Sequence, residues 1–168
     1  MKILLLTGAS GSGKTTIGRS LNKNDSNFNF IRSFTDRPRR NNEYQTDHHF
    51  ISKRIMNLML TYEIVASTTI DGYRYCTTYS QFDDHKINIY IVDKKGIEDT
   101  KNIFKDAQIF SVLVKRDNIN IDQSRKKRYI VIPDAEDVDF VLENNANLPK
   151  VVENLKQKVL SEFGVKHV

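Results

Sequence analysis

Short apolar runs alternate with amphipathic segments along most of this chain. Three runs have the continuous apolar character of parallel strands buried on both faces: residues 3–7, 87–92 and 109–114. Residues 15–21 and 97–104 fit helices, and residues 140–142 add a short strand. This alternation predicts an α/β fold with a parallel sheet, right-handed crossovers and helices on both faces. Apolar positions recur at helical spacing in residues 148–163, which predicts an amphipathic closing helix.

The pattern changes between residues 35 and 80, where short mixed elements replace the alternation. A helix is predicted within residues 51–62, an extended segment at 63–70, and a hairpin at Asp71-Gly72. We interpret 35–80 as an inserted subdomain of a single domain whose core comprises 1–34, 81–114 and 129–168. A second polar insertion, residues 115–128, ends in four basic residues and is a candidate mobile lid.

A glycine-rich segment follows the first predicted strand. Residues 8–15 read Gly-Ala-Ser-Gly-Ser-Gly-Lys-Thr, which meets the pattern G-x-x-x-x-G-K-[ST] in full. A triphosphate needs a ring of backbone N–H groups, a lysine that neutralises charge and a hydroxyl that binds Mg²⁺, and Lys14 and Thr15 supply the last two. The alternative is a plain glycine turn that joins strand to helix. The position between a predicted strand and a predicted helix favours a site for ATP and Mg²⁺.

Three arginines lie within the four residues 37–40, which read Arg-Pro-Arg-Arg. Guanidinium groups bind phosphate through paired hydrogen bonds, and Pro38 restricts the backbone of the loop. A solvated basic loop or a nucleic-acid patch is the alternative for such a segment on its own. Together with the phosphate loop, it indicates that donor and acceptor are both phosphorylated.

Composition narrows the class of protein. A chain of 168 residues that is 39% hydrophobic can bury one core, so one globular unit is expected. The net charge of +5 suits nucleic acid or a pocket for several phosphates. The single cysteine, Cys76, excludes an internal disulfide, and no apolar run reaches the roughly 20 residues that span a bilayer. The first residues also lack the features of a signal peptide, so a soluble, cytoplasmic protein is expected.

On these motifs the sequence resembles the guanylate kinases, a family of nucleoside monophosphate kinases. The family's acceptor pattern S-x-T-T-R-P-x-R-x-x-E is matched by Ser33, Thr35, Arg37, Pro38, Arg40 and Glu43, and its D-Y-x-F by residues 47–50 after one deletion. Residues 72–77 echo G-x-Y-Y-G-[ST], residues 91–96 echo D-I-D-x-Q-G, and residues 140–145 resemble the late strand beside the adenine. The resemblance implies a P-loop NTPase sheet flanked by helices, with an inserted acceptor-binding subdomain and a short lid.

Carried over to this chain, the resemblance implies a donor site around the glycine loop. The residues that would bind ATP are Gly8, Ser10, Gly11, Ser12, Gly13, Lys14, Thr15, Thr16 and, beside the adenine, Asn144. Thr15 and Asp93 would hold Mg²⁺, with capping of the following helix as the alternative for Asp93. The residues that would act in catalysis are Lys14, Arg37, Arg40, Asp93 and, from the lid, Arg125 and Arg128. Arg116 is a further candidate for a lid arginine.

The same resemblance implies an acceptor site in the inserted subdomain. Arg37, Arg40 and Tyr75 would hold the acceptor's phosphate. His48 stands where a phosphate-binding tyrosine is usual, and a surface histidine is its alternative. The remaining predicted contacts of the acceptor are Ser33, Glu43, Ala66 and Thr77, of which Ser33 and Thr77 match positions that touch guanine.

Base choice is where this sequence departs from the family. The guanine-reading glutamate falls at Ala66, and the nearby Glu63 lies three positions earlier. Three residues of strand cover about 10 Å and reverse the face, so Glu63 can replace it only if the strand bulges. We therefore predict that guanine is not read through a carboxylate, and that GMP or dGMP is preferred over another monophosphate by about tenfold or less.

The sequence thus predicts an ATP-dependent kinase of a nucleoside or deoxynucleoside monophosphate. Three alternatives stay open: a P-loop kinase of another phosphorylated or modified nucleotide, a non-catalytic module of guanylate-kinase shape, and a nucleic-acid-binding protein. The intact Gly13-Lys14-Thr15 argues against the module. A nucleic-acid binder would show a long basic stripe with interleaved aromatics instead of this loop. Neither a membrane nor a nucleic acid is expected as a partner.

Overall fold

The computed structural model describes residues 1–41, 43–61, 64–117, 119 and 131–165. The chain divides into two compact units, one formed by Met1–Phe30 with Asp83–Val168 and the other by Ile31–Phe82. Most of the predicted lid, including Arg125 and Arg128, lies outside the described residues. Within the described part of the chain, no helix is long and apolar enough to cross a membrane.

The first unit is built on a five-stranded sheet with the order β2-β7-β1-β8-β9 and parallel pairing throughout. Its strands are β1 (Lys2–Thr7), β2 (Phe28–Phe30), β7 (Ile87–Ile91), β8 (Gln108–Lys115) and β9 (Phe140–Glu143). Because β1 lies at the centre and both its faces are covered, residues 3–6 have no exposed surface. The predicted parallel α/β sheet is confirmed.

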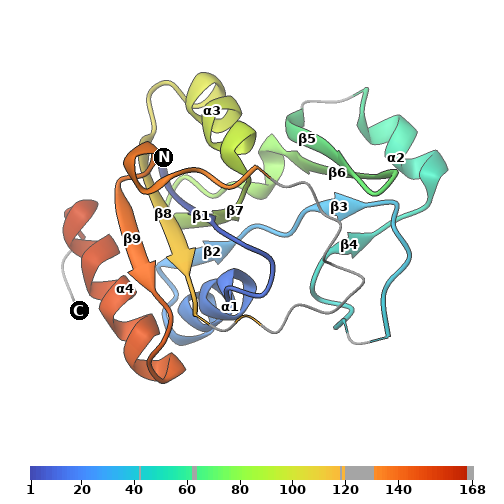
Figure 1. Cartoon of the computed structure of the whole chain (residues 1–168). Coiled ribbons are helices and arrows are strands. Elements are labelled where there is room, and N and C mark those ends of the chain that lie inside the picture. Colours follow the sequence, from blue (N-terminus) through green and yellow to red (C-terminus); the bar gives the residue numbers. More distant parts are fainter. Residues whose placement is uncertain (42, 62–63, 118, 120–130, 166–168) are drawn as a thin grey trace. The chain divides into compact units, whose positions relative to one another are not determined.

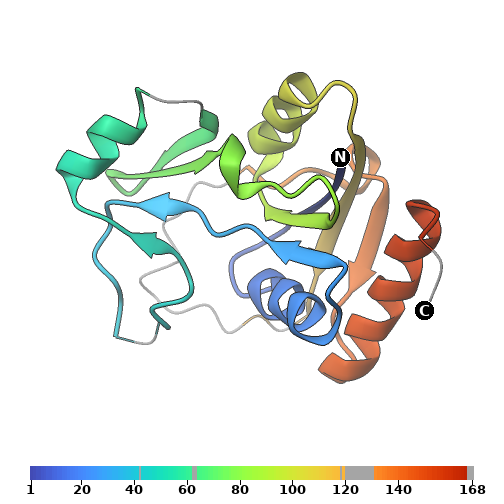
Figure 2. The same cartoon turned by 180° about the vertical axis from the view of Figure 1, so that it is seen from behind.

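Helices cover both faces of this sheet (Figures 1 and 2). Helices α1 (Lys14–Asn24) and α4 (Leu148–Glu162) pack together on one face, and α3 (Lys94–Ile103) lies on the other. A short 3-10 turn, η3 (Ala135–Asp137), precedes β9. The face toward α1 and α4 carries the main apolar core, whose members include Leu4, Leu6, Ile17, Ile89, Val112 and Leu155. Burial of this apolar surface is the chief stabilising contribution to the unit.

The carboxyl ends of neighbouring strands meet at one edge of the sheet. Leu6 of β1 pairs with Ile91 of β7, and Thr7 of β1 pairs with Leu113 of β8. The glycine loop follows β1 directly, and Asp93 follows β7 by two residues. Ligands of open parallel sheets bind at this edge. The fold therefore brings the residues that are predicted to bind ATP and Mg²⁺ to the edge where such ligands bind.

The second unit is a four-stranded mixed sheet with the order β4-β3-β6-β5. Its elements are β3 (Phe34–Thr35), β4 (His49–Phe50), α2 (Lys53–Met59), β5 (Ile64–Ile70), β6 (Tyr73–Thr78) and the 3-10 turn η1 (Tyr79–Gln81). Strands β5 and β6 form an antiparallel hairpin through Asp71 and Gly72, whose φ angles of 53° and 78° suit a tight hairpin turn. The predicted helix, extended segment and hairpin are all present.

Strand β5 contains a bulge next to Ala66. Ile64 pairs with Thr78, whereas Ala66 pairs with Thr77, so one residue of β5 is extra at this point. One extra residue reverses the alternation of side chains that precede it. The bulge lies between Ile64 and Ala66, and Glu63 lies outside the described residues.

Candidate active site

The glycine loop joins the end of β1 to the first turn of α1. Gly8 and Gly13 have φ angles of 136° and 101°, a region that residues with a Cβ atom avoid. A Cβ on Gly8 would lie 2.4 Å from the carbonyl oxygen of Val114, and one on Gly13 would lie 2.3 Å from Nδ2 of Asn144. Both the backbone conformation and the close packing therefore require glycine at these two positions.

Lys14 turns its ammonium group back into this loop. Its Nζ donates to the carbonyl oxygens of Gly8 at 2.8 Å and Ala9 at 2.7 Å, and it lies 3.4 Å from the hydroxyl oxygen of Ser12. The loop therefore holds a positive charge inside a turn of the backbone at the start of a helix. Backbone N–H groups and a cation in this arrangement suit an anion such as phosphate.

Asn144 braces the glycine loop from the end of β9. Its Nδ2 donates to the carbonyl oxygen of Ser12 at 2.7 Å, and its backbone N–H donates to the carbonyl oxygen of Lys115 at 2.8 Å. Asn144 is predicted to lie beside the adenine, and this side chain also fixes the shape of the phosphate loop. The sequence contains no signal for this brace, because the two partners are 132 positions apart.

A cleft of about 540 Å³ opens beside the loop, a volume typical of small-molecule sites. It is lined by Gly13, Thr16, Arg116, Asp117, Asn144, Asn145, Ala146 and Leu148. Asp117 and Asn145 bind each other through two hydrogen bonds of 2.9 Å, one from the backbone N–H of Asp117 and one from Nδ2 of Asn145. Neither residue is among the site residues predicted from the sequence, although Asn145 ends the predicted segment 140–145 and Asp117 lies in the predicted lid.

Thr15 and Asp93 are the oxygen donors predicted for Mg²⁺. Thr15 is exposed in the first turn of α1. Asp93 caps α3, because its Oδ1 accepts a 2.8 Å hydrogen bond from the backbone N–H of Gly96. The described residues contain no group of three or more His, Cys, Asp and Glu that would hold a metal ion. Mg²⁺ bound to substrate phosphates needs only one or two protein oxygens, so Thr15 and the second oxygen of Asp93 fit it.

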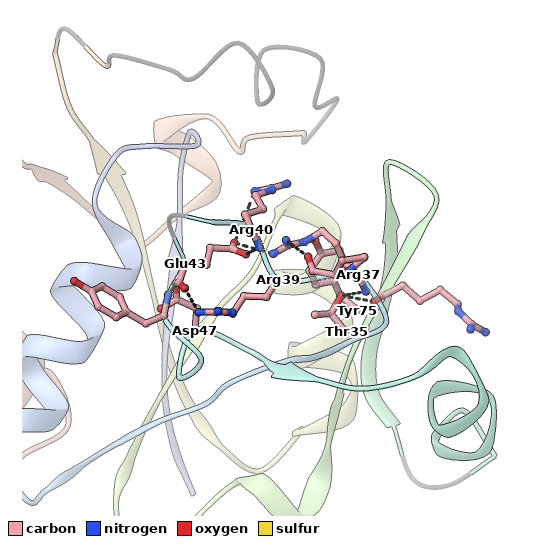
Figure 3. Close-up of polar contacts among 10 residues, drawn as sticks. Thr35, Arg37, Arg39, Arg40, Glu43, Asp47 and Tyr75 are labelled. Atoms are coloured by element: carbon pink, nitrogen blue, oxygen red, sulfur yellow. Dashed lines mark hydrogen bonds and ion pairs between the residues drawn. The ribbon is translucent and has the colours of Figure 1, made fainter.

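In the second unit, Arg37 lies at the centre of a buried polar cluster (Figure 3). Its guanidinium donates from Nε to the hydroxyl of Tyr75 at 2.8 Å, from Nη2 to Glu43 at 2.7 Å, and from Nη1 to the carbonyl oxygen of Pro38 at 2.8 Å. The ring centroid of Phe50 lies 5.7 Å from the same guanidinium. Arg37 is only 6% exposed, so its orientation is set before any ligand binds.

Glu43 connects the two arginines that are predicted to bind phosphate. Its Oε1 binds Arg37, and its Oε2 accepts a 3.0 Å hydrogen bond from the backbone N–H of Arg40. Burial alone would raise the pKa of Glu43, but hydrogen bonds from Arg37 and Arg40 outweigh it and hold the pKa below its usual value. The ionised carboxylate therefore holds the Arg37 side chain and the Arg40 backbone close together.

Arg40 and His48 complete this cluster. The side chain of Arg40 is 28% exposed, and its Nη1 lies 3.8 Å from Glu43. The ring of His48 lies between Tyr75 and Phe50, with centroid distances of 5.6 and 5.8 Å. Its Nδ1 is buried and has no hydrogen-bond partner among the described residues. The structure therefore brings Arg37, Arg40, His48 and Tyr75 into one cluster, as the sequence predicts for the acceptor's phosphate.

The residues predicted near the acceptor base lie on neighbouring strands of the same unit. Ala66 of β5 and Thr77 of β6 pair directly, and Ser33 precedes β3 and accepts a 3.0 Å backbone hydrogen bond from His49. Thr77 has no exposed surface, and its hydroxyl oxygen finds no partner within the described residues. A buried hydroxyl without a partner is unfavourable, so it marks a position where a ligand would add a hydrogen bond.

The parallel sheet, the glycine loop after β1 and the helix that starts at Lys14 define a P-loop NTPase fold. No family model matches the chain. It is 30% identical over 146 residues to a guanylate kinase of Agrobacterium fabrum, covering 83% of this chain and 64% of that protein. It is 45% identical over 58 residues to a guanylate kinase of Chelativorans sp., covering 34% of this chain and 27% of that protein.

Among solved structures, the crystal structure of guanylate kinase from Anaplasma phagocytophilum matches with a TM-score of 0.72 at 16% identity. The match covers 96% of this chain and 85% of that one. The chain therefore has a guanylate kinase-like fold. It spans 64% of the length of the Agrobacterium relative and 27% of the Chelativorans relative.

Proposed function

We propose that this protein is a nucleoside monophosphate kinase that transfers the γ-phosphate of ATP to a nucleoside or deoxynucleoside monophosphate. The observation that carries the proposal is the presence of two separate groups whose charge and hydrogen-bond donors suit phosphate. One is the glycine loop with Lys14 in the first unit, and the other is the cluster of Arg37, Arg40 and Tyr75 in the second. The names of the similar proteins make GMP the first acceptor to test.

On the donor side, backbone N–H groups of the glycine loop would bind the β- and γ-phosphates. Lys14 would exchange its contacts with the carbonyl oxygens of Gly8 and Ala9 for phosphate oxygens, and so stay close to the charge that develops during transfer. The cleft beside Asn145 and Leu148 would take the nucleoside part of ATP. Mg²⁺ would be held by Thr15 and Asp93, and it would neutralise part of the negative charge of the triphosphate.

On the acceptor side, Arg37, Arg40, His48 and Tyr75 would bind the monophosphate. In the reaction, an oxygen of this phosphate bonds to the γ-phosphorus while the bond from that phosphorus to the β-phosphate oxygen breaks. The products are a nucleoside diphosphate and ADP. The protein needs no nucleophilic side chain for this step, because orientation and charge stabilisation supply the catalysis. Lid arginines are part of the proposal, with Arg125 and Arg128 as the candidates.

A coupled assay for ADP release against all eight ribo- and deoxynucleoside monophosphates tests the proposal. We expect Mg²⁺-dependent turnover with at least one of them. Lys14→Ala should lower turnover about a hundredfold or more while the protein stays folded, because the lysine charge is needed in the transition state and its side chain lies outside the core. Lys23→Ala, which removes an exposed lysine near the end of α1, is the matched control and should keep wild-type turnover.

The same assay separates the alternatives. A kinase of another phosphorylated nucleotide would bind ATP with Mg²⁺ but release no ADP with any of the eight acceptors. A non-catalytic module or a nucleic-acid binder would show no Mg²⁺-dependent ATP binding in a calorimetric titration. Near-normal turnover of the Lys14→Ala variant would overturn the assignment of the glycine loop.

A further inference from the structure

Asp36 and Arg74 form a buried ion pair in the second unit, next to the arginine cluster. The side chain of Asp36 is 2% exposed. Its Oδ1 accepts a 2.8 Å hydrogen bond from the backbone N–H of Arg74, and its Oδ2 accepts from Nε at 2.8 Å and lies 2.7 Å from Nη2. Burial raises the pKa of Asp36, but these hydrogen bonds prevail and the pKa is lowered. The carboxylate is therefore ionised, and Arg74 binds both of its oxygens, Oδ1 through the backbone N–H and Oδ2 through the guanidinium group.

Each member of this pair is the direct neighbour of a predicted phosphate ligand. Asp36 precedes Arg37, and Arg74 precedes Tyr75. The carbonyl oxygen of Arg74 also accepts from the hydroxyl of Thr35 at 2.9 Å, and that hydroxyl oxygen accepts from the backbone N–H of Arg37 at 3.2 Å. Arg37 in turn donates a 2.8 Å hydrogen bond to the hydroxyl of Tyr75, the residue that follows Arg74. The ion pair and the ligand pair thus lie side by side across the contact between β3 and β6.

Arg74 also reaches helix α2. Its Nη1 donates to the side-chain oxygen of Asn57, and its Nη2 lies 3.4 Å from the carbonyl oxygen of Lys53. One guanidinium group therefore joins α2 to the strands that carry the acceptor cluster. Arginine suits this task better than lysine because its planar group donates in several fixed directions.

The two positions also depart together from the sequence pattern that this chain resembles. In S-x-T-T-R-P the residue before the arginine is threonine, and here it is Asp36. In G-x-Y-Y-G-[ST] the first tyrosine falls at Arg74. In this structure, the residues at these two positions bind each other.

We propose that the Asp36 and Arg74 ion pair is a positioning pair, which holds Arg37 and Tyr75 in the orientation that binds the acceptor's phosphate. The pair acts on the bound phosphate through these two neighbours. The inference rests on the proposed function for the identity of the ligand, which is represented below by GMP.

The test is a double-mutant cycle with the residues of the pattern: Asp36→Thr, Arg74→Tyr and the double variant. Each single change should raise the KM for GMP about tenfold or more, because small displacements of binding groups have large kinetic effects. The KM for ATP should change by less than about twofold, and the double variant should recover most of the loss. Arg74→Lys keeps the positive charge but not the planar guanidinium group, so its KM for GMP should lie between those of wild type and Arg74→Tyr. Arg54→Ala, an exposed arginine on α2, is the control that should leave all constants unchanged.

A second readout does not depend on turnover. In protein labelled with ¹⁵N-arginine, the Nε–H of Arg37 should exchange slowly with solvent in wild type and faster in either single variant, since its hydrogen bond to Tyr75 is loosened. Unchanged exchange and an unchanged KM for GMP in the single variants would overturn the proposal. So would equal rises in the KM for ATP and GMP, or additive losses in the double variant. If wild type takes no monophosphate at all, the proposed function fails, and the exchange rate still decides whether the pair positions Arg37.

Discussion

Arg37 and Arg40 both contact Glu43, but they differ in burial. Arg37 is 6% exposed and has three hydrogen-bond partners, whereas the side chain of Arg40 is 28% exposed. Removing Arg37 takes a partner from a buried carboxylate, and breaking a buried ion pair costs about 3–5 kcal/mol. The two arginines are thus expected to contribute differently to stability and similarly to binding.

We predict that Arg40→Ala raises the KM for the acceptor about tenfold with little change in melting temperature. Arg37→Ala should raise the same constant and also lower the melting temperature by about 10 °C or more. Steady-state kinetics with GMP and ATP, together with thermal unfolding, check both. An equal rise in the KM for ATP would instead place this loop on the donor side.

His48 links pH to stability at the same cluster. Burial first, and then the charge of Arg37, lower its pKa, against the opposing effects of Glu43, Asp47 and the carbonyl group of Ser33. A histidine in the unfolded chain has a pKa of about 6.5. As the pH falls below that value, the unfolded chain takes up a proton before the folded protein does. Stability is therefore full above about pH 6.5 and decreases as the pH drops toward the lower, folded-state pKa.

We predict that His48→Gln reduces this loss of unfolding free energy between about pH 6.5 and 5. Urea unfolding at several pH values measures it. His49 acts in the same direction, since burial and Arg32 lower its pKa, so the double variant with His49→Gln should have a flatter profile still. A His48→Gln profile parallel to that of wild type would show that this histidine does not contribute.

At the scale of single elements, the start of helix α3 tests the two interpretations of Asp93. Its Oδ1 caps the helix through Gly96, and its charge is the proposed contact with Mg²⁺. Asparagine caps a helix about as well as aspartate but carries no charge. Asp93→Asn should therefore keep the melting temperature and lower Mg²⁺-dependent turnover, whereas Asp93→Ala should lower turnover and also lose about 1 kcal/mol of stability.

The matched control for this experiment is Ser52→Ala at helix α2. The Ser52 hydroxyl oxygen accepts a 3.3 Å hydrogen bond from the backbone N–H of Ile55, which is the same kind of cap. This variant should lose about 1 kcal/mol and keep its turnover per folded molecule. If Asp93→Asn also kept full turnover, Asp93 would be a helix cap and nothing more.

Strand β5 carries the prediction on base choice. Ala66 shares a face with Thr77, whose buried hydroxyl has no partner among the described residues, and no carboxylate occupies position 66. Wild type should prefer GMP over other monophosphates by about tenfold or less, and Ala66→Glu should increase that preference, since a buried acceptor penalises bases that leave it unsatisfied. Ser67→Glu places the same carboxylate on the opposite face of the strand and should leave the preference for GMP unchanged.

The acceptor panel measures both variants. A wild-type preference for GMP of about a thousandfold would contradict the prediction. Because β5 bulges before Ala66, Glu63 would then be the first residue to replace.

The proposed ATP-binding and acceptor-binding groups belong to two different compact units of the chain. ATP with Mg²⁺ should therefore slow amide hydrogen exchange in residues 8–16 and around Asn144, and GMP should slow it in residues 33–50 and 66–77. Some openings of the structure require the ligand to dissociate first. When the free ligand concentration is about ten times the dissociation constant, amide exchange through those openings becomes about tenfold slower. Mass spectrometry of the two complexes shows which peptides respond. Protection of the glycine loop by GMP alone would reverse the assignment.

Much of the first unit was predictable because its signals are local. A buried central strand needs a continuous apolar run, and residues 3–7 show it before any contact is known. The phosphate loop needs glycines and a lysine at fixed spacing, so Gly8 to Thr15 carry the prediction by themselves. In the second unit, the hairpin at Asp71-Gly72 is likewise a property of two adjacent residues. The roles of these site residues in binding and catalysis remain predictions.

Contacts between side chains that are distant in the sequence depend on how the chain folds. Asn144 braces the loop at Ser12 across 132 positions, and Asp36 binds Arg74 across 38. Such contacts depend on strand order and register, and one residue of slip turns every side chain of a strand to the other face. The bulge in β5 is a shift of this kind, set by pairing with β6. Local patterns of hydrophobic and polar residues do not record register, so these contacts became visible only in the folded chain.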